Sequence, residues 1–185
     1  RLGAALRRHL HASDDQPAPG GETVRVLAVA DQISAADVDA IADAGYRTIV
    51  CNRPDNEVAG QPTYLDIERA AVMRGLQVFC LPVVSGQVQD NQALQMAQVL
   101  KALPEPILAY CRSGTRSVVL WALAEAGKRD TDEILQLAAS AGYDLNAMRG
   151  RLQALAGQGR LGSQSDQLVV CPGVRAVPAT AEAAS

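Results

Sequence analysis

Cys111 is the residue of this chain whose type and setting best suit nucleophilic chemistry. It ends a short apolar run, PILAYC, and six small or polar residues follow before the next apolar stretch, VVLWALA. Within that loop Gly114 permits the positive φ angle that a tight turn from a strand into a helix needs. The following helix N-terminus carries partial positive charge. We therefore predict a loop whose amide groups bind an anion above the thiol.

The side chains of this loop add to its positive field. Two arginines contribute full charges and three hydroxyl groups contribute donors. Such a field stabilises a thiolate, so the predicted nucleophile, Cys111, needs no histidine beside it. Arg116 is the predicted clamp on a bound oxyanion, because a guanidinium can donate two parallel hydrogen bonds. The other predicted anion-binding residues are Arg112, Ser113, Gly114, Thr115 and Ser117.

Histidine and cysteine usage excludes other kinds of site. The only two histidines, His9 and His11, lie near the N-terminus, which argues against a papain-like Cys–His pair and against a histidine-containing zinc site. We expect neither a metal nor a cofactor. The four cysteines form no C-x-x-C pair and no disulfide framework. Cys51 and Cys80 are expected to be buried thiols, and a reducing, cytoplasmic location is predicted.

Charge and hydropathy limit the expected partners. The formal net charge is −3 and no basic block covers the presumed folded part, so nucleic acid is not an expected partner. No apolar run approaches the roughly 18–20 residues of a membrane span. The expected partner is a small anionic substrate: thiosulfate, a persulfide or a phosphate ester.

The elements that position Cys111 follow from alternating apolar patterns. Strands are predicted at 23–30, 46–51, 76–84 and 106–111, and helices at 34–45, 63–75, 90–104, 116–126, 131–141 and 144–155, with Ser34, Thr63 and Asp90 as helix caps. This alternation predicts an α/β fold with a mainly parallel sheet of four to five strands flanked by helices. Ligands of such sheets bind at the carboxyl ends of the strands.

Two further loops are predicted at the same edge of the sheet as Cys111. Asn52, Arg53 and Asp55 follow the second strand, where we expect either substrate contact or a salt-bridged turn. In the loop after the third strand, residues 83–89, we expect Ser85, Gly86 and Gln87 to form a plain turn, with a place at the rim of the pocket as the alternative. Asp90 is the only carboxylate near that loop and is expected either to cap a helix or to act in catalysis.

The ends of the chain differ from its centre in composition. Residues 1–22 predict a flexible basic arm that ends in a Pro/Gly linker, and residues 157–185 predict a flexible tail or interdomain linker. The catalytic domain is predicted to span residues 23–156. The chain begins with Arg, so a domain cut from a longer protein fits the sequence.

Two resemblances give these patterns a family context. The loop YCRSGTRS resembles the active-site loop of rhodanese-type sulfurtransferases, in which the cysteine carries a persulfide. Over residues 24–126 the chain resembles the phosphatase-like domain of the beta-lactamase-hydrolase-like proteins. This wider resemblance implies a fold similar to dual-specificity cysteine phosphatases, with a rhodanese-like fold as the alternative. It also implies a fused or partner redox domain.

The resemblances leave two chemistries open. Cysteine phosphatases carry H-C-x5-R, but here Tyr110 replaces the histidine and Arg116 arrives after four residues. A phosphatase also needs an acid for its leaving group, whereas sulfur transfer between good leaving groups does not. The main expectation is therefore a rhodanese-type sulfurtransferase that forms a persulfide on Cys111 and passes it to a thiol, sulfite or cyanide. The alternatives are a tyrosine or dual-specificity phosphatase using Cys111, and a non-catalytic anion-binding module.

Overall fold

The computed structural model describes residues 9–10 and 27–158. Residues 159–185 of the predicted tail and most of the predicted arm at 1–22 lie outside the described residues, and Gly157, at the start of the predicted tail, still belongs to α6. Within the arm, β1 (His9–Leu10) pairs antiparallel with β2, so these two residues join the sheet.

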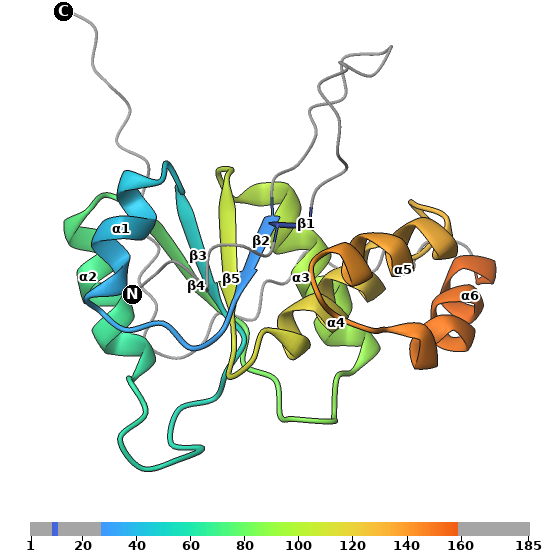
Figure 1. Cartoon of the computed structure of the whole chain (residues 1–185), viewed down its shortest axis with the longest axis horizontal. Coiled ribbons are helices and arrows are strands. Elements are labelled where there is room, and N and C mark those ends of the chain that lie inside the picture. The colour runs from blue at the N-terminus through green and yellow to red at the C-terminus, as the bar shows by residue number, and fades with distance from the viewer. Residues whose placement is uncertain (1–8, 11–26, 159–185) are drawn as a thin grey trace, which may run out of the picture.

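The central sheet has the order β1-β2-β5-β3-β4. The strands β2 (Leu27–Ala30), β3 (Thr48–Cys51), β4 (Gln77–Cys80) and β5 (Ile107–Tyr110) are mutually parallel. Every residue of β2, β3 and β5 is buried, because both faces of the sheet are covered by helices. The predicted α/β fold with a mainly parallel sheet is confirmed (Figure 1).

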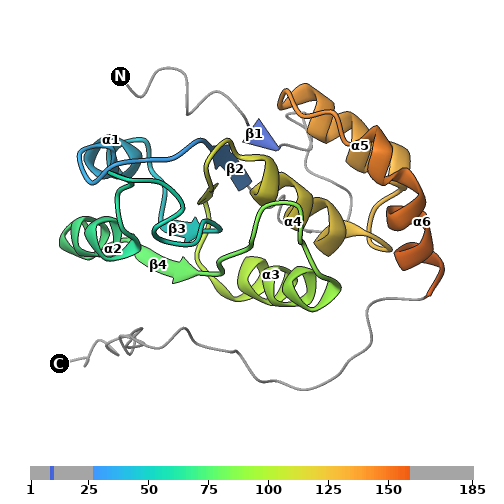
Figure 2. The same cartoon turned by 90° about the horizontal axis from the view of Figure 1, so that it is seen from below.

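The helices form layers on both sides of this sheet (Figure 2). One face carries α1 (Asp37–Asp43) and α2 (Tyr64–Met73), and the other carries α3 (Asp90–Ala102) and α4 (Thr115–Glu125). Beyond α4 lie α5 (Thr131–Ser140), a 3₁₀ turn (Asn146–Met148) and α6 (Arg149–Gly157). None of the described helices is long and apolar enough to cross a membrane.

The sheet separates two apolar clusters. The larger one joins the α3–α4 side of the sheet to α5 and α6 and includes Leu120, Ile134 and Leu152, all fully buried. The smaller one lies under α1 and α2 and includes Ile41, Ile67 and Tyr110. Both clusters are made by the apolar residues whose spacing predicted the elements.

The predicted helix caps are correct in one case of three. Thr63 forms a reciprocal capping box with Asp66, as predicted. Ser34 binds the Asp37 carboxylate through its amide and hydroxyl, but α1 begins only at Asp37. The prediction that Asp90 caps α3 is wrong: Gln89 is the N-cap and forms the capping box with Gln92.

Candidate active site

Cys111 lies directly after β5, at the floor of the loop that leads into α4. Its side chain is buried, with 1% of the residue exposed, and the Gly114 N–H donates to Sγ at 3.1 Å. Gly114 has φ +86°, and a Cβ there would collide with the Tyr143 hydroxyl and meet Val29 Cγ1 at 2.9 Å. Glycine is therefore required both by the backbone angle and by the space.

The carbonyl groups of this loop are held by donors outside it. Arg112 O accepts from the Gln32 N–H at 3.3 Å, and Ser113 O accepts from the Tyr143 hydroxyl at 3.0 Å. In a trans peptide the N–H of the next residue points opposite to the carbonyl. The amide groups of Ser113 and Gly114 thus point away from these outer contacts, and that of Gly114 reaches the sulfur. This arrangement is what an anion-binding nest requires, and anion binding itself stays a prediction.

The Arg116 side chain is buried beneath the loop and bound to a carboxylate. Its Nη1 donates to Glu57 Oε1 at 2.6 Å and to Val83 O at 2.7 Å, while Nη2 donates to Glu57 Oε2 at 3.0 Å. The hydrogen bond to Glu57 is the main cause that raises the pKa of Arg116, and attraction to Cys111 adds to it. Arg116 is therefore a permanent cation in the first turn of α4, five positions after Cys111.

Glu57 is bound by a second arginine as well. Arg53 Nε donates to Glu57 Oε2 at 2.7 Å, and Arg53 Nη1 donates to Gln32 Oε1 at 2.9 Å. The hydrogen bond from Arg116, helped by that from Arg53, lowers the pKa of Glu57 to about 2. Two guanidinium groups thus share one carboxylate, and the trio keeps a net positive charge at neutral pH.

Asn52 and Asp55 have structural contacts. Asn52 is fully buried, and its Nδ2 donates to Leu81 O at 3.1 Å, which ties the loop after β3 to the loop after β4. Its Oδ1 has no hydrogen-bond partner among the described residues. Asp55 Oδ1 accepts from the Tyr64 amide at 2.9 Å, at the start of α2. Of the two expectations for this segment, these contacts fit a structural turn.

The hydroxyl groups of the loop lie in different environments. The Ser113 and Thr115 hydroxyls are exposed and 3.1 Å apart. The Ser117 Oγ is buried and has no hydrogen-bond partner in the described part of the chain. The exposed hydroxyls can contact a ligand that enters from solvent, whereas the buried Ser117 hydroxyl can contact only groups in the interior.

Asp90 forms an ion pair at the start of α3. Its Oδ1 accepts from Arg151 Nη2 at 2.5 Å, and the same Nη2 donates to Val88 O at 2.9 Å. With Glu57 bound by two arginines and Asp55 bound at α2, each carboxylate of these loops already has a partner. Among the described residues, no three His, Cys, Asp or Glu side chains form a group that could hold a metal ion.

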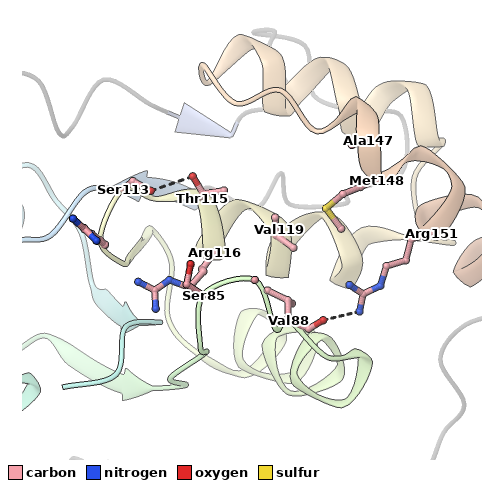
Figure 3. A pocket seen from close by; sticks show the side chains of 11 residues that line it. Ser85, Val88, Ser113, Thr115, Arg116, Val119, Ala147, Met148 and Arg151 are labelled. Atoms are coloured by element: carbon pink, nitrogen blue, oxygen red, sulfur yellow. Dashed lines mark hydrogen bonds between the residues drawn. The ribbon is translucent and has the colours of Figure 1, made fainter. Parts of the chain in front are cut away.

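A pocket of about 380 Å³ opens beside the cysteine loop (Figure 3). The loop supplies Arg112, Ser113, Thr115 and Arg116. The segment after β4 supplies Ser85, Gly86 and Val88, while α4 supplies Val119, the 3₁₀ turn supplies Ala147 and Met148, and α6 supplies Arg151. Gln87, the third residue of the expected turn, is not among the lining residues.

Sequence reasoning missed several residues of this site. Glu57 follows Arg53 in the loop after β3, but a lone glutamate gives no sign of a partner 59 residues away. Tyr143, Met148 and Arg151 come from the helices after the loop, and only their packing on α4 brings them near it. None of the three lies in a motif that marks a site.

Comparisons with known proteins agree with this geometry. The family described as "Beta-lactamase hydrolase-like protein, phosphatase-like domain" matches residues 22–128. A beta-lactamase hydrolase-like protein of Xylella fastidiosa is 33% identical over 122 residues, which are 64% of this chain and 28% of the relative. The chain thus spans 28% of the length of that curated relative.

Solved structures show the same fold. The crystal structure of a candidate phosphatase from Neisseria meningitidis has 35% identity and a TM-score of 0.63, and covers 69% of this chain and 92% of that one. A mutant form of Tk-PTP has 18% identity and a TM-score of 0.55, with coverage of 71% and 90%. These similarities favour the phosphatase alternative over the sulfurtransferase that the loop length suggested, and they show the cysteine-phosphatase-like fold rather than the rhodanese-like one.

Proposed function

Because the chain belongs to the family of beta-lactamase hydrolase-like protein, phosphatase-like domains, we propose that it is a cysteine-dependent phosphatase of small phosphate monoesters. The observation that carries this proposal is the Cys111 sulfur beneath a loop of inward-facing amides at the N-terminus of α4, with Arg116 beside it. Such a site combines a nucleophile with donors for the oxygens of a phosphoryl group.

The proposed reaction has two steps. The Cys111 thiolate attacks phosphorus, the bond to the ester oxygen breaks, and the phosphoryl group is transferred to sulfur. Water then attacks phosphorus, which releases phosphate and restores the thiolate. The loop amides and Arg116 stabilise the charge on the equatorial oxygens in both steps.

The acidity of the leaving alcohol determines how fast this site hydrolyses a phosphate ester. The neighbouring carboxylates Glu57, Asp55 and Asp90 are all engaged elsewhere, so none is placed to protonate the departing oxygen. General acid catalysis contributes roughly 10²–10⁴-fold. Esters of acidic alcohols, such as phenols, are therefore the favoured substrates, and simple alkyl phosphates should be much slower.

A second candidate function rests on the length of the loop. Only four residues separate Cys111 from Arg116, one fewer than in the phosphatase pattern, and sulfur transfer needs no acid. In this reaction the Cys111 thiolate attacks the outer sulfur of thiosulfate and sulfite leaves. The persulfide then gives its outer sulfur to a thiol, sulfite or cyanide.

One comparison separates the two candidates. We expect kcat/KM for an aryl phosphate to exceed that for thiosulfate with a cyanide acceptor in the same preparation. Cys111→Ser should abolish both activities, whereas Cys80→Ser, which changes a half-buried thiol on β4, should abolish neither. A higher kcat/KM for thiosulfate would overturn the phosphatase proposal in favour of sulfur transfer. Absence of both activities would leave a non-catalytic anion-binding module.

A further inference from the structure

The pocket beside the cysteine loop has arginines at both ends and apolar side chains between them. Two of these arginines pair with carboxylates outside the lining, Arg116 with Glu57 and Arg151 with Asp90. Arg116 and Arg112 border it on the side of the cysteine loop, and Arg151 borders it on the side of α6. Figure 3 shows Val119 and Met148 between Arg116 and Arg151. The lining residues include no Asp or Glu.

The size of the pocket exceeds what one oxyanion needs. Its volume of about 380 Å³ lies within the range of roughly 300–1,000 Å³ that is typical of sites for organic ligands. A bound phosphoryl group at the cysteine loop would leave the apolar wall and Arg151 without contact. The geometry thus fits a substrate that continues from the phosphoryl group across Met148 to α6.

Arg151 has donors available for such a substrate. Its bonds to Val88 O and to Asp90 both use Nη2. A guanidinium has five N–H donors, so the three on Nη1 and Nε remain for single hydrogen bonds to a ligand. The ion pair with Asp90 is partly exposed, and exposed pairs are weak enough for a ligand carboxylate to share the arginine.

The Arg151 end of the pocket belongs to a part of the chain that the family match does not reach. The match ends at residue 128, whereas the wall formed by Ala147, Met148 and Arg151 lies at the 3₁₀ turn and the start of α6. The cysteine loop lies within the matched part of the chain, but it does not determine which part of a ligand these three wall residues contact.

We propose that this pocket selects a dianionic organic substrate: a phosphate monoester whose short apolar body packs on Met148 and Val119 and whose second anionic group, such as a carboxylate, pairs with Arg151. The identity of the first anion as a phosphate ester rests on the proposed function. The subsite at Arg151 rests only on the shape and charge of the pocket.

Binding to a chain that cannot turn over tests the subsite directly. The probes are benzylphosphonate and 4-carboxybenzylphosphonate, titrated by calorimetry into the Cys111→Ser protein. We expect the carboxylate to tighten binding by up to about fivefold, the gain expected for one partly exposed ion pair. Adding Arg151→Gln should remove that gain and leave the affinity for benzylphosphonate unchanged.

Arg149→Gln is the matched control. Arg149 lies two residues away on α6 with similar exposure, 43% against 38%, but it pairs with Asp132 and does not line the pocket. The gain from the carboxylate should survive this change. Met148→Ala should weaken both phosphonates alike and leave inorganic phosphate unaffected, since only the benzyl group contacts the apolar wall.

The possible outcomes separate the two proposals. Equal affinity for the two phosphonates, or a gain that survives Arg151→Gln, would overturn the subsite while leaving phosphatase activity intact. If the expected binding pattern appears but the unmodified chain hydrolyses neither phenyl phosphate nor 4-carboxyphenyl phosphate, the subsite stands and the phosphatase proposal fails.

Discussion

Glu57 is the residue on which the charge of the site depends. It accepts hydrogen bonds from Arg116 and from Arg53, two residues from different loops that would otherwise repel each other. An arginine left alone beneath the loop would also be freer to move. Glu57 therefore fixes the position of the Arg116 guanidinium, and in doing so it occupies N–H donors on both Nη1 and Nη2 of Arg116.

The low pKa of Glu57 predicts how stability changes with acid. A carboxyl whose pKa is lowered on folding stabilises the fold above its unfolded pKa, roughly 4.3, and this contribution is lost as the pH falls towards about 2. We expect Glu57→Gln to lower the free energy of unfolding near neutral pH and to flatten its decline over this acid range. Urea denaturation at several pH values measures both effects.

Glu133→Gln is the control for this prediction. Glu133 also pairs with an arginine, but on an exposed helix surface, where an ion pair contributes little. Its substitution should leave both the neutral-pH stability and the acid dependence close to those of the unchanged chain. An acid dependence for Glu57→Gln that equals the original would show that the two arginines do not stabilise this carboxylate.

The sequence predicted the cysteine loop but not its partners. Cys111, Gly114 and Arg116 stand within six residues, so a local pattern of strand, turn and helix was enough to group them. Glu57 contributes through contacts that form only in the folded chain. Asp90 was misassigned because Asp is a preferred N-cap residue, whereas α3 has its N-cap one position earlier, at Gln89, in a capping box with Gln92, and Asp90 pairs with Arg151.

At the scale of elements, the segment after α5 contacts the cysteine loop and holds one of its carbonyl groups. Tyr143 is buried between α5 and the 3₁₀ turn, and its hydroxyl donates to Ser113 O at 3.0 Å. Its ring therefore packs in the larger core cluster while its polar end holds the loop. Strands and most helices were predicted by hydrophobic period, but this contact joins residues 30 positions apart and has no local signature.

Tyr143→Phe should loosen the loop while leaving the core packed. Removing one hydrogen bond typically costs about 0.5–1.5 kcal/mol of stability. We expect a loss in that range by urea denaturation, together with a lower kcat, because the Ser113–Gly114 peptide is no longer held. Tyr64→Phe, which removes a hydroxyl contact to Glu68 on α2, should leave kcat unchanged. If both variants behave alike, Tyr143 has no special role in orienting the loop.

At the scale of the whole molecule, the fold extends beyond the part that defines the family. The match ends at residue 128, yet Ile134 and Leu152, from α5 and α6, are fully buried in the same cluster as Leu120. The sequence predicted both of these helices. It could not predict that they cover α4, since two amphipathic helices can pack in several ways.

A chain truncated after Gly127 should not fold stably. Burying one large aliphatic side chain contributes about 1.5–3 kcal/mol, and a domain is stable by only about 5–15 kcal/mol. Removing Ile134, Leu135, Leu152 and Leu155 together should therefore abolish cooperative thermal unfolding followed by circular dichroism. A chain ending at Gln158, which keeps every described helix, is the control and should melt cooperatively. A cooperative transition in the shorter chain would mean that α5 and α6 are accessory to the core.

The carbonyl groups of the cysteine loop are fixed by three separate segments: Gln32 after β2, Tyr143 after α5, and Val118 within α4. The amides of Ser113 and Gly114 consequently point inward, and that of Gly114 reaches the sulfur. Water around a reacting phosphate must reorient its dipoles for each reaction event, whereas dipoles held by a fold do not. In this domain the ordering occurs once, during folding, and each turnover of the proposed reaction would begin from dipoles that are already aligned.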